Sequence, residues 1–301
     1  MVQLDRRQFI RQSAGMVGAA LLAPAAAAAA PPGKASDLVP LGRTGLRIAR
    51  LGIGTGSHNG HVQRSLGAAG FERLIRHGVE RGITYIDTAD NYKTHVLIAG
   101  AIRGLPRERL FIQTKMPWHR PEFRERPLEV LDRYRRELGV EYIDSLLIHC
   151  TTDASWPDDL ARMMDAFSEA KQKGVIRAKG VSCHGLHPLR RATATDWVDV
   201  HLVRVNPQGR HVDTERNEWE ALGDIDVVMR EVRAMHAKGR GIIGMKLAGN
   251  GDFRDPADRD RALRYAMASG CVDAVTMGFA STTELDDAVR RMEQALAHAQ
   301  G

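Results

Sequence analysis

Four polar residues at or just past the ends of short apolar runs have the side chains that a proton-transfer site needs. They are Asp87, Tyr92, Lys115 and His149. A tyrosine, with an ordinary pKa near ~10, is a weak acid at neutral pH, but a lysine ammonium within hydrogen-bond reach lowers that pKa. Asp87 would keep Lys115 charged and oriented, and His149 would hydrogen-bond a substrate oxygen or relay a proton. These residue types suit carbonyl reduction, because the carbonyl oxygen gains negative charge that must be protonated or hydrogen-bonded.

Eight apolar runs of strand length alternate with helical patterns along the chain, and several of these patterns stop at a glycine. The predicted strands span residues 50–54, 84–87, 110–115, 142–149, 176–182, 200–205, 241–246 and 274–277. The predicted helices span residues 69–81, 94–103, 127–138, 156–173, 188–194, 224–238, 258–269 and 282–297. Eight strand–helix units predict an α/β fold, the (β/α)8 TIM barrel. The C-terminal ends of parallel barrel strands open onto one face, so this fold would bring the four polar residues together.

Two short segments near the first predicted strand bear on the architecture. Glycines at 52, 54 and 56 suggest the dinucleotide motif of a doubly wound sheet as a competing fold, but no helix opens on them and the third glycine has the wrong spacing. Residues 41–46, Leu-Gly-Arg-Thr-Gly-Leu, predict an N-terminal hairpin that closes the barrel floor. We therefore expect one barrel domain over residues 38–298.

Each of the four polar residues also has an ordinary structural explanation. An aspartate at a strand end caps helices, a loop tyrosine can be a surface residue, a lysine can be a salt-bridge partner, and a histidine can sit satisfied at the core edge. Taken singly, these explanations would prevail. The joint pattern favours function, because three consecutive strand ends and one adjoining loop supply complementary acid–base groups.

The first thirty residues have the pattern of an export signal. The run Asp5-Arg6-Arg7-Gln8-Phe9-Ile10-Arg11 precedes an apolar segment at 14–23 and an alanine run at 25–30. We interpret residues 1–30 as a twin-arginine signal peptide, with cleavage ahead of Pro31. The apolar segment is too short for a stable membrane span; a retained amphipathic anchor is the alternative. The signal predicts a periplasmic protein whose export partner is the twin-arginine translocation machinery.

Composition limits the remaining functional classes. The chain has 301 residues, of which 43% are apolar, which suffices for a full core without disulfides or metals. Its formal charge of +6 comes from basic residues interspersed with acidic ones, and aromatics are only 5%, so nucleic acid is not an expected partner. Three cysteines argue against a disulfide framework. Cys183, His184 and His187 match no standard zinc spacing, so we expect no metal.

The segments Ile86-Asp87-Thr88-Ala89-Asp90-Asn91-Tyr92, Thr114-Lys115 and Leu147-Ile148-His149 resemble the catalytic tetrad of the aldo-keto reductases. The opening hairpin and Gly180-Val181-Ser182 are similar to that family too. The resemblance covers residues 38–298. It implies an oxidoreductase that reduces a carbonyl, or oxidises the matching alcohol, with a nicotinamide cofactor. Tyr92 would be the general acid, Lys115 and Asp87 would tune it, and His149 would orient the carbonyl.

The same resemblance implies which residues contact the cofactor. They are Gly54, Thr55, Ser182, Lys246, Gly278 and Ser281. NADP and NAD both remain open, because Glu284 stands where the family often has a residue that contacts the adenosine 2′-phosphate, and a carboxylate would repel a phosphate.

Two classes of function therefore stay open. The first is a reductase acting on a small carbonyl or sugar-like molecule. The second is a barrel that uses the same tetrad for lyase or epimerase proton transfer on a sugar, or that serves only as a ligand-binding module, since the fold alone does not fix the reaction.

Overall fold

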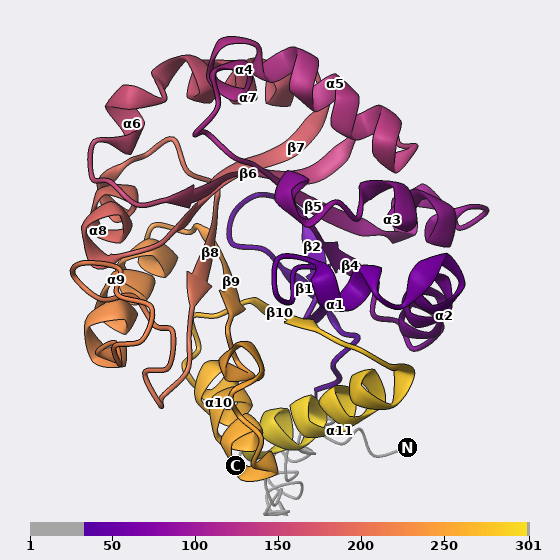
Figure 1. The fold of residues 1–301 in the computed structure, drawn as a ribbon. Coiled ribbons are helices and arrows are strands. Elements are labelled where there is room, and N and C mark those ends of the chain that lie inside the picture. Colours follow the sequence, from indigo (N-terminus) through magenta and orange to yellow (C-terminus); the bar gives the residue numbers. More distant parts are fainter. Residues whose placement is uncertain (1–32, 300–301) are drawn as a thin grey trace, which may run out of the picture. The chain divides into compact units, whose positions relative to one another are not determined.

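Eight parallel strands form a closed barrel surrounded by helices in the computed structural model, which describes residues 33–299 (Figure 1). The predicted (β/α)8 fold is confirmed. Around the barrel, the strands follow the order of the chain from β3 (Leu51–Gly54) to β10 (Ala274–Gly278), and β10 pairs with β3 to close it. The expected twin-arginine segment, residues 1–30, lies outside the described residues.

The barrel strands coincide closely with the eight predicted ones. They are β3 (Leu51–Gly54), β4 (Tyr85–Asp87), β5 (Phe111–Met116), β6 (Ile143–Thr151), β7 (Ile176–Cys183), β8 (Val200–Arg204), β9 (Gly241–Met245) and β10 (Ala274–Gly278). The helices are α1 (His61–Arg64), α2 (Gly67–Glu80), α3 (His95–Ile102), α4 (Pro121–Glu125), α5 (Pro127–Leu138), α6 (Trp156–Asp159), α7 (Ala161–Gln172), α8 (Leu186–Ala194), α9 (Ile225–Ala237), α10 (Pro256–Ala268) and α11 (Thr282–Ala299). Short 3-10 turns are η2 (Asp90–Tyr92), η3 (Arg107–Arg109) and η4 (Gly249–Gly251).

Two details of the helices differ from the sequence prediction. The helix expected over 156–173 is divided into α6 and α7, because Leu160 leaves helical dihedral angles (φ −113°, ψ 18°). The short helices α1 and α4, of four and five residues, were not predicted. They are too short to show a helical repeat of apolar residues.

Side chains of alternate strand residues fill the inside of the barrel. On β8, Val200 and Leu202 belong to an interior cluster with Leu147 of β6 and Ile243 of β9, whereas Val203 packs in the outer cluster among the helices. Gly180 of β7 lets β8 approach closely, since a Cβ there would lie 2.0 Å from the Val200 carbonyl oxygen. Arg204 is in phase with Val200 and Leu202 and therefore points into the barrel.

The predicted hairpin closes the floor of the barrel. Strands β1 (Leu38–Pro40) and β2 (Arg47–Ala49) pair antiparallel. Leu41, between them, is fully buried in the interior cluster. The hairpin therefore supplies apolar side chains to the end of the barrel opposite the strand C-termini.

Replacing Leu41 by alanine should cost about 2–5 kcal/mol of unfolding free energy, because a fully buried leucine loses its contacts and leaves a cavity. Urea unfolding of the variant would measure the loss. Leu38→Ala is the matched control on the same hairpin, because Leu38 is 49% exposed and its truncation should change stability by less than ~0.5 kcal/mol. Equal losses in the two variants would show that the hairpin is not part of the cooperative core.

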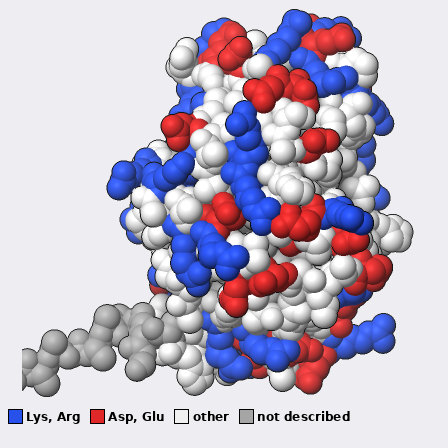
Figure 2. Space-filling view, turned by 90° about the vertical axis from the view of Figure 1, so that its left-hand side faces the viewer, with Lys and Arg blue, Asp and Glu red and all other residues white. Residues whose placement is uncertain are grey.

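The outer surface over α6, α8 and α9 carries basic and acidic side chains next to each other (Figure 2). Pairs such as Arg190–Glu215 and Arg191–Asp158 account for part of this mixture. Across residues 33–299, no helix has the length and apolar character required to span a membrane.

Candidate active site

Asp87, Lys115 and His149 point into the C-terminal mouth of the barrel from three neighbouring strands, β4, β5 and β6. Tyr92 reaches the same place from η2, one short turn beyond β4. Lys115 Nζ lies 2.8 Å from Asp87 Oδ1 and 4.9 Å from the centre of the Tyr92 ring. The rings of Tyr92 and His149 meet edge to face, with centroids 5.6 Å apart. The structure thus brings together all four residues that the sequence singled out.

The Asp87–Lys115 pair is almost completely buried, at 4% and 1% exposure. Lys115 Nζ donates to Asp87 Oδ2 (2.9 Å) and to the Thr88 carbonyl (2.8 Å), and Gln113 Nε2 donates to Asp87 Oδ1 (2.9 Å). Burial opposes the charge on Lys115, but Asp87 and Tyr92 outweigh it and raise the pKa of Lys115. The lysine therefore remains an ammonium beside Tyr92.

The Tyr92 ring packs on the backbone of the loop after β3. A Cβ on Gly56 would lie 2.4 Å from that ring, so only glycine leaves room for it. Burial raises the pKa of Tyr92, and the attraction of Lys115 for the phenolate only reduces this rise. The lowered pKa expected from sequence is thus wrong in its net direction, because desolvation outweighs the lysine. At neutral pH Tyr92 carries its proton and can donate it.

His149 is held in its neutral form. Burial, followed by the charges of Lys115 and His119, lowers the pKa of His149 from 6.5 to about 3. Its Nδ1 is buried and has no partner in the part of the chain that the structure describes. A neutral imidazole can donate a hydrogen bond through one nitrogen and accept one through the other. His149 is therefore suited to orienting a carbonyl oxygen next to Tyr92.

Thr55 ties the ends of β3 and β4 together. It is fully buried; both its amide (2.9 Å) and its hydroxyl (3.0 Å) donate to the Asp87 carbonyl, and the hydroxyl also contacts Thr94 Oγ1 (2.9 Å). These contacts hold the ends of β3 and β4 together and position Asp87, and the contact between Thr55 and a cofactor that the family resemblance implies stays a prediction.

A family model described as the aldo/keto reductase family matches residues 50–218, more than half of the chain. The chain belongs to this family. The matched region contains the four residues at the barrel mouth and ends before β9 and β10.

Individual relatives agree with the family assignment. This family member is 32% identical over 146 residues to the 9,11-endoperoxide prostaglandin H2 reductase of Trypanosoma cruzi, which covers 48% of this chain and 47% of the relative. It thus spans about half the length of the first curated relatives it matches. In fold it is similar to an aldo-keto reductase of Pseudomonas aeruginosa (TM-score 0.71, 20% identity, 87% and 98% of the two chains). It is also similar to one of Klebsiella pneumoniae solved in complex with NADPH (TM-score 0.60, 20% identity, 87% and 89%).

The other residues that the family resemblance assigned to the cofactor lie at the strand ends from β7 to β10, on the adjoining β3 and at the start of α11. Ser182 is next to His149 in the β6–β7 register, and its hydroxyl is buried without a partner among the described residues. Lys246 follows β9, and Gly278 ends β10, parallel to Gly54 of β3. The unsatisfied Ser182 hydroxyl fits the carboxamide of a nicotinamide, since a buried hydroxyl without a partner is costly.

The start of α11 is already partly occupied by side chains of the protein. Glu284 Oε2 accepts from the Ala280 amide (2.7 Å), and Ser281 Oγ accepts from the Glu284 amide (3.1 Å). Ser281 thus serves as a helix cap, and the Glu284 carboxylate stands where a phosphate would bind. This arrangement leaves the choice between NADP and NAD open.

Cys183, His184 and His187 do not form a metal centre with other ligands, and residues 33–299 contain no group of three candidate metal ligands. His184 instead contacts Cys150, with Nδ1 and Sγ 2.8 Å apart. The Thr151 hydroxyl donates a hydrogen bond to Cys183 Sγ. All three cysteines are free.

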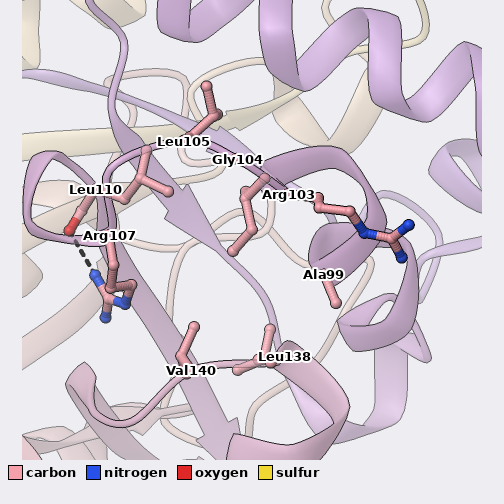
Figure 3. A pocket seen from close by; sticks show the side chains of 10 residues that line it. Ala99, Arg103, Gly104, Leu105, Arg107, Leu110, Leu138 and Val140 are labelled. Carbon is pink, nitrogen blue, oxygen red and sulfur yellow. Dashed lines mark hydrogen bonds between the residues drawn. The ribbon is translucent and has the colours of Figure 1, made fainter.

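A cavity of about 360 Å³ lies away from this site, between α3 and α5 (Figure 3). Leu110, which precedes β5, lines it, so the cavity is at the opposite end of that strand from Lys115. Its lining is mainly aliphatic, and Arg107 is committed to the Leu110 carbonyl and to Asp144. It presents no acid–base group suited to the chemistry at the barrel mouth.

Arg204 is a residue that sequence analysis missed. It ends β8, as Lys115 and His149 lie near the ends of their strands, and it is only 3% exposed. The criterion that selected the other residues, a polar residue closing an apolar run, would have selected Arg204. The tetrad pattern selected only residues on or next to strands β4 to β6.

The depressed pKa of His149 predicts a specific acid sensitivity. Between pH ~6.5 and about 3 the unfolded chain would bind a proton at this histidine, whereas the folded chain would not. Its contribution to stability is therefore present above pH 6.5 and is lost as the pH falls toward 3. Nuclear magnetic resonance of the imidazole should show no titration of His149 between pH 5 and 8. A midpoint near 6.5 would contradict the assigned neutral form.

Proposed function

We propose that this family member reduces an aldehyde or ketone with a nicotinamide cofactor. The proposal rests chiefly on the buried Asp87–Lys115 pair beside a protonated Tyr92, with neutral His149 edge-on to the same tyrosine. Family membership supports it, and so does the NADPH bound in the structure of the Klebsiella pneumoniae relative.

In the proposed mechanism the substrate carbonyl lies between Tyr92 and His149. A nicotinamide cofactor, when bound, would be the source of the hydride that the carbonyl carbon gains. His149 hydrogen-bonds the carbonyl oxygen, and Tyr92 gives that oxygen its phenolic proton. Lys115 stabilises the phenolate left on Tyr92, and Asp87 keeps Lys115 charged and in position. In the reverse direction, the same phenolate would accept a proton from an alcohol.

Ser182, whose buried hydroxyl has no partner among the described residues, would hold the nicotinamide carboxamide, whereas the family resemblance alone assigns Lys246 to the cofactor. Gly54 and Gly278 end the first and last strands, with Gly54 buried and Gly278 exposed but covered on its Cβ side by Ser57 Oγ. Ser281, which caps α11, would lie at the start of that helix beside the cofactor. NADP and NAD are both candidates, because Glu284 opposes a 2′-phosphate at that helix.

We also propose that the twin-arginine signal at residues 1–30 directs export to the periplasm, with the cofactor bound before translocation. The support is the Arg6-Arg7 pair followed by an apolar segment and an alanine run. Replacing Arg6 and Arg7 together by lysine should leave the protein in the cytoplasmic fraction. Unchanged recovery from the periplasmic fraction would refute the route.

The decisive test is cofactor binding and turnover by the purified chain. We would denature the protein as isolated, identify any released nucleotide, and titrate the nucleotide-free protein with NADPH and NADH. Oxidation of either nucleotide that depends on an added aldehyde supports the proposal. No binding of either at millimolar concentration would eliminate it and favour a non-reductase use of the tetrad.

A further inference from the structure

A second polar group lies at the mouth of the barrel, on the side of β8 and β9. It consists of Arg204, Lys246 and Trp219, with the Cys150–His184 contact beside them. The Trp219 ring lies over both cations, 5.7 Å from the Arg204 guanidinium carbon and 5.0 Å from Lys246 Nζ. The proton-transfer steps proposed above use none of these side chains.

Arg204 has one edge engaged and one edge free. Its Nη1 donates to Asp213 Oδ1 (3.2 Å) and to Asn217 Oδ1 (3.1 Å). Within residues 33–299, Nε and Nη2 donate to no side chain or carbonyl, and Nε is completely buried. The Nε–Nη2 edge of a guanidinium is a pair of parallel donors that matches a carboxylate in a bidentate contact.

Lys246 lacks an acidic partner among the described residues. Its Nζ donates to Asn250 Oδ1 (2.8 Å), while the nearby Asp252 is engaged by Arg210 (2.6 Å) and His211 (3.1 Å). Burial and the charge of Arg204 lower the pKa of Lys246 to about 8. Among the described residues, no carboxylate therefore balances the charge of the Lys246 ammonium.

The backbone conformations of two neighbouring residues support a functional role for this place. Cys150 has φ 60° and Lys246 has φ 68°, in the left-handed region that usually requires glycine or asparagine. At Cys150 the register between β6 and β7 shifts, which is the mark of a β-bulge. Strain of this kind is retained where it directs a side chain to a site.

We propose that Arg204 and Lys246 bind a carboxylate of the substrate, so that the preferred substrates are aldehydes or ketones that carry a carboxylate. This assignment rests on the reductase function proposed above. A carboxylate would satisfy the free Arg204 edge and supply the negative charge that Lys246 lacks.

The position of Arg204 fits a group on the same small molecule as the carbonyl. His149 lies on β6 and Arg204 on β8, two strands further along the barrel wall. The usual spacing of neighbouring strands makes this separation roughly 10 Å. Arg204 also points into the barrel, because it is in phase with Val200 and Leu202 of the interior cluster. A short carbon chain can therefore place its carbonyl at Tyr92 and its carboxylate at Arg204.

The test compares substrates that differ in one charge. Succinic semialdehyde and its methyl ester would be assayed with the nucleotide that the enzyme accepts, and longer oxo acids would then map the spacing. Charge-assisted contacts predict a kcat/KM for the acid about ten- to a hundredfold above that of the ester, mainly through KM. An equal or higher value for the ester would overturn the proposal.

Variants assign the preference to the two cations. Arg204→Gln alone would leave Asp213 buried without its partner, so Arg204→Gln with Asp213→Asn is the variant that keeps the buried charge balanced. In this double variant and in Lys246→Gln, kcat/KM for the acid should fall at least tenfold more than for the ester. Lys173→Gln, which removes an exposed cation on the C-terminal side of α7, is the control and should retain the preference.

Direct binding separates this inference from the proposed reaction. Calorimetric titration with succinate should give a weaker dissociation constant in the double variant than in the unaltered chain, whether or not any aldehyde is reduced. If the double variant instead weakens binding of NADPH or NADH and leaves succinate unaffected, the cations serve the cofactor diphosphate and the proposal fails. Aldehyde reduction without acid preference would refute this inference alone.

Discussion

Replacing Tyr92 by phenylalanine should lower the rate of carbonyl reduction about a hundred- to ten-thousandfold, which is the usual contribution of a positioned general acid. The phenylalanine ring keeps the packing on Gly56 and the edge contact with His149 and removes only the hydroxyl. The loss should therefore appear in kcat, because the developing oxyanion would have no proton donor. Steady-state kinetics with the better of the two nucleotides would measure it.

The control for Tyr92→Phe is the same substitution at Tyr142, which precedes β6 at the far end of the barrel and lies against Arg107. Tyr142→Phe should leave kcat unchanged. Nucleotide affinity, measured by quenching of tryptophan fluorescence, should be equal in both variants and in the unaltered chain. Turnover within threefold of normal in Tyr92→Phe would exclude the tyrosine as the acid.

The barrel and the convergence of the four residues could be predicted because both depend on local sequence patterns. Eight apolar runs separated by helical patterns restrict the chain to few architectures, and parallel strands place residues such as Lys115 and His149 on one face. The floor hairpin followed from turn glycines flanked by leucines. In each case the relevant information lay within a few residues along the chain.

The features that the sequence did not reveal depend on contacts between distant segments. Whether the pKa of Tyr92 rises or falls depends on two opposing effects. Burial against the loop after β3 raises this pKa, and the attraction of Lys115 for the phenolate lowers it by less. The left-handed Cys150 arises from the register between β6 and β7. The role proposed for Arg204 depends on the loop after β8, which folds back so that Asp213 accepts a hydrogen bond from one edge of the guanidinium and leaves the other edge free within residues 33–299.

Replacing Lys115 by methionine should both abolish reduction and destabilise the fold. Removing the ammonium leaves the Asp87 carboxylate almost fully buried without a counter-charge, which costs about 3–5 kcal/mol when one member of a buried pair is deleted. Tyr92 would also lose the cation that stabilises its phenolate. Urea unfolding and steady-state kinetics on the same preparation would measure the two effects.

A double variant separates the stability effect from the catalytic one. With Asp87→Asn added to Lys115→Met, no buried charge remains unpaired, and Gln113 Nε2 can still donate to the oxygen at position 87. We expect most of the lost unfolding free energy to return, while the rate of reduction remains low because Tyr92 still lacks its ammonium. If activity recovered together with stability, the Asp87–Lys115 pair would be a structural element only, and the acid strength of Tyr92 would have another origin.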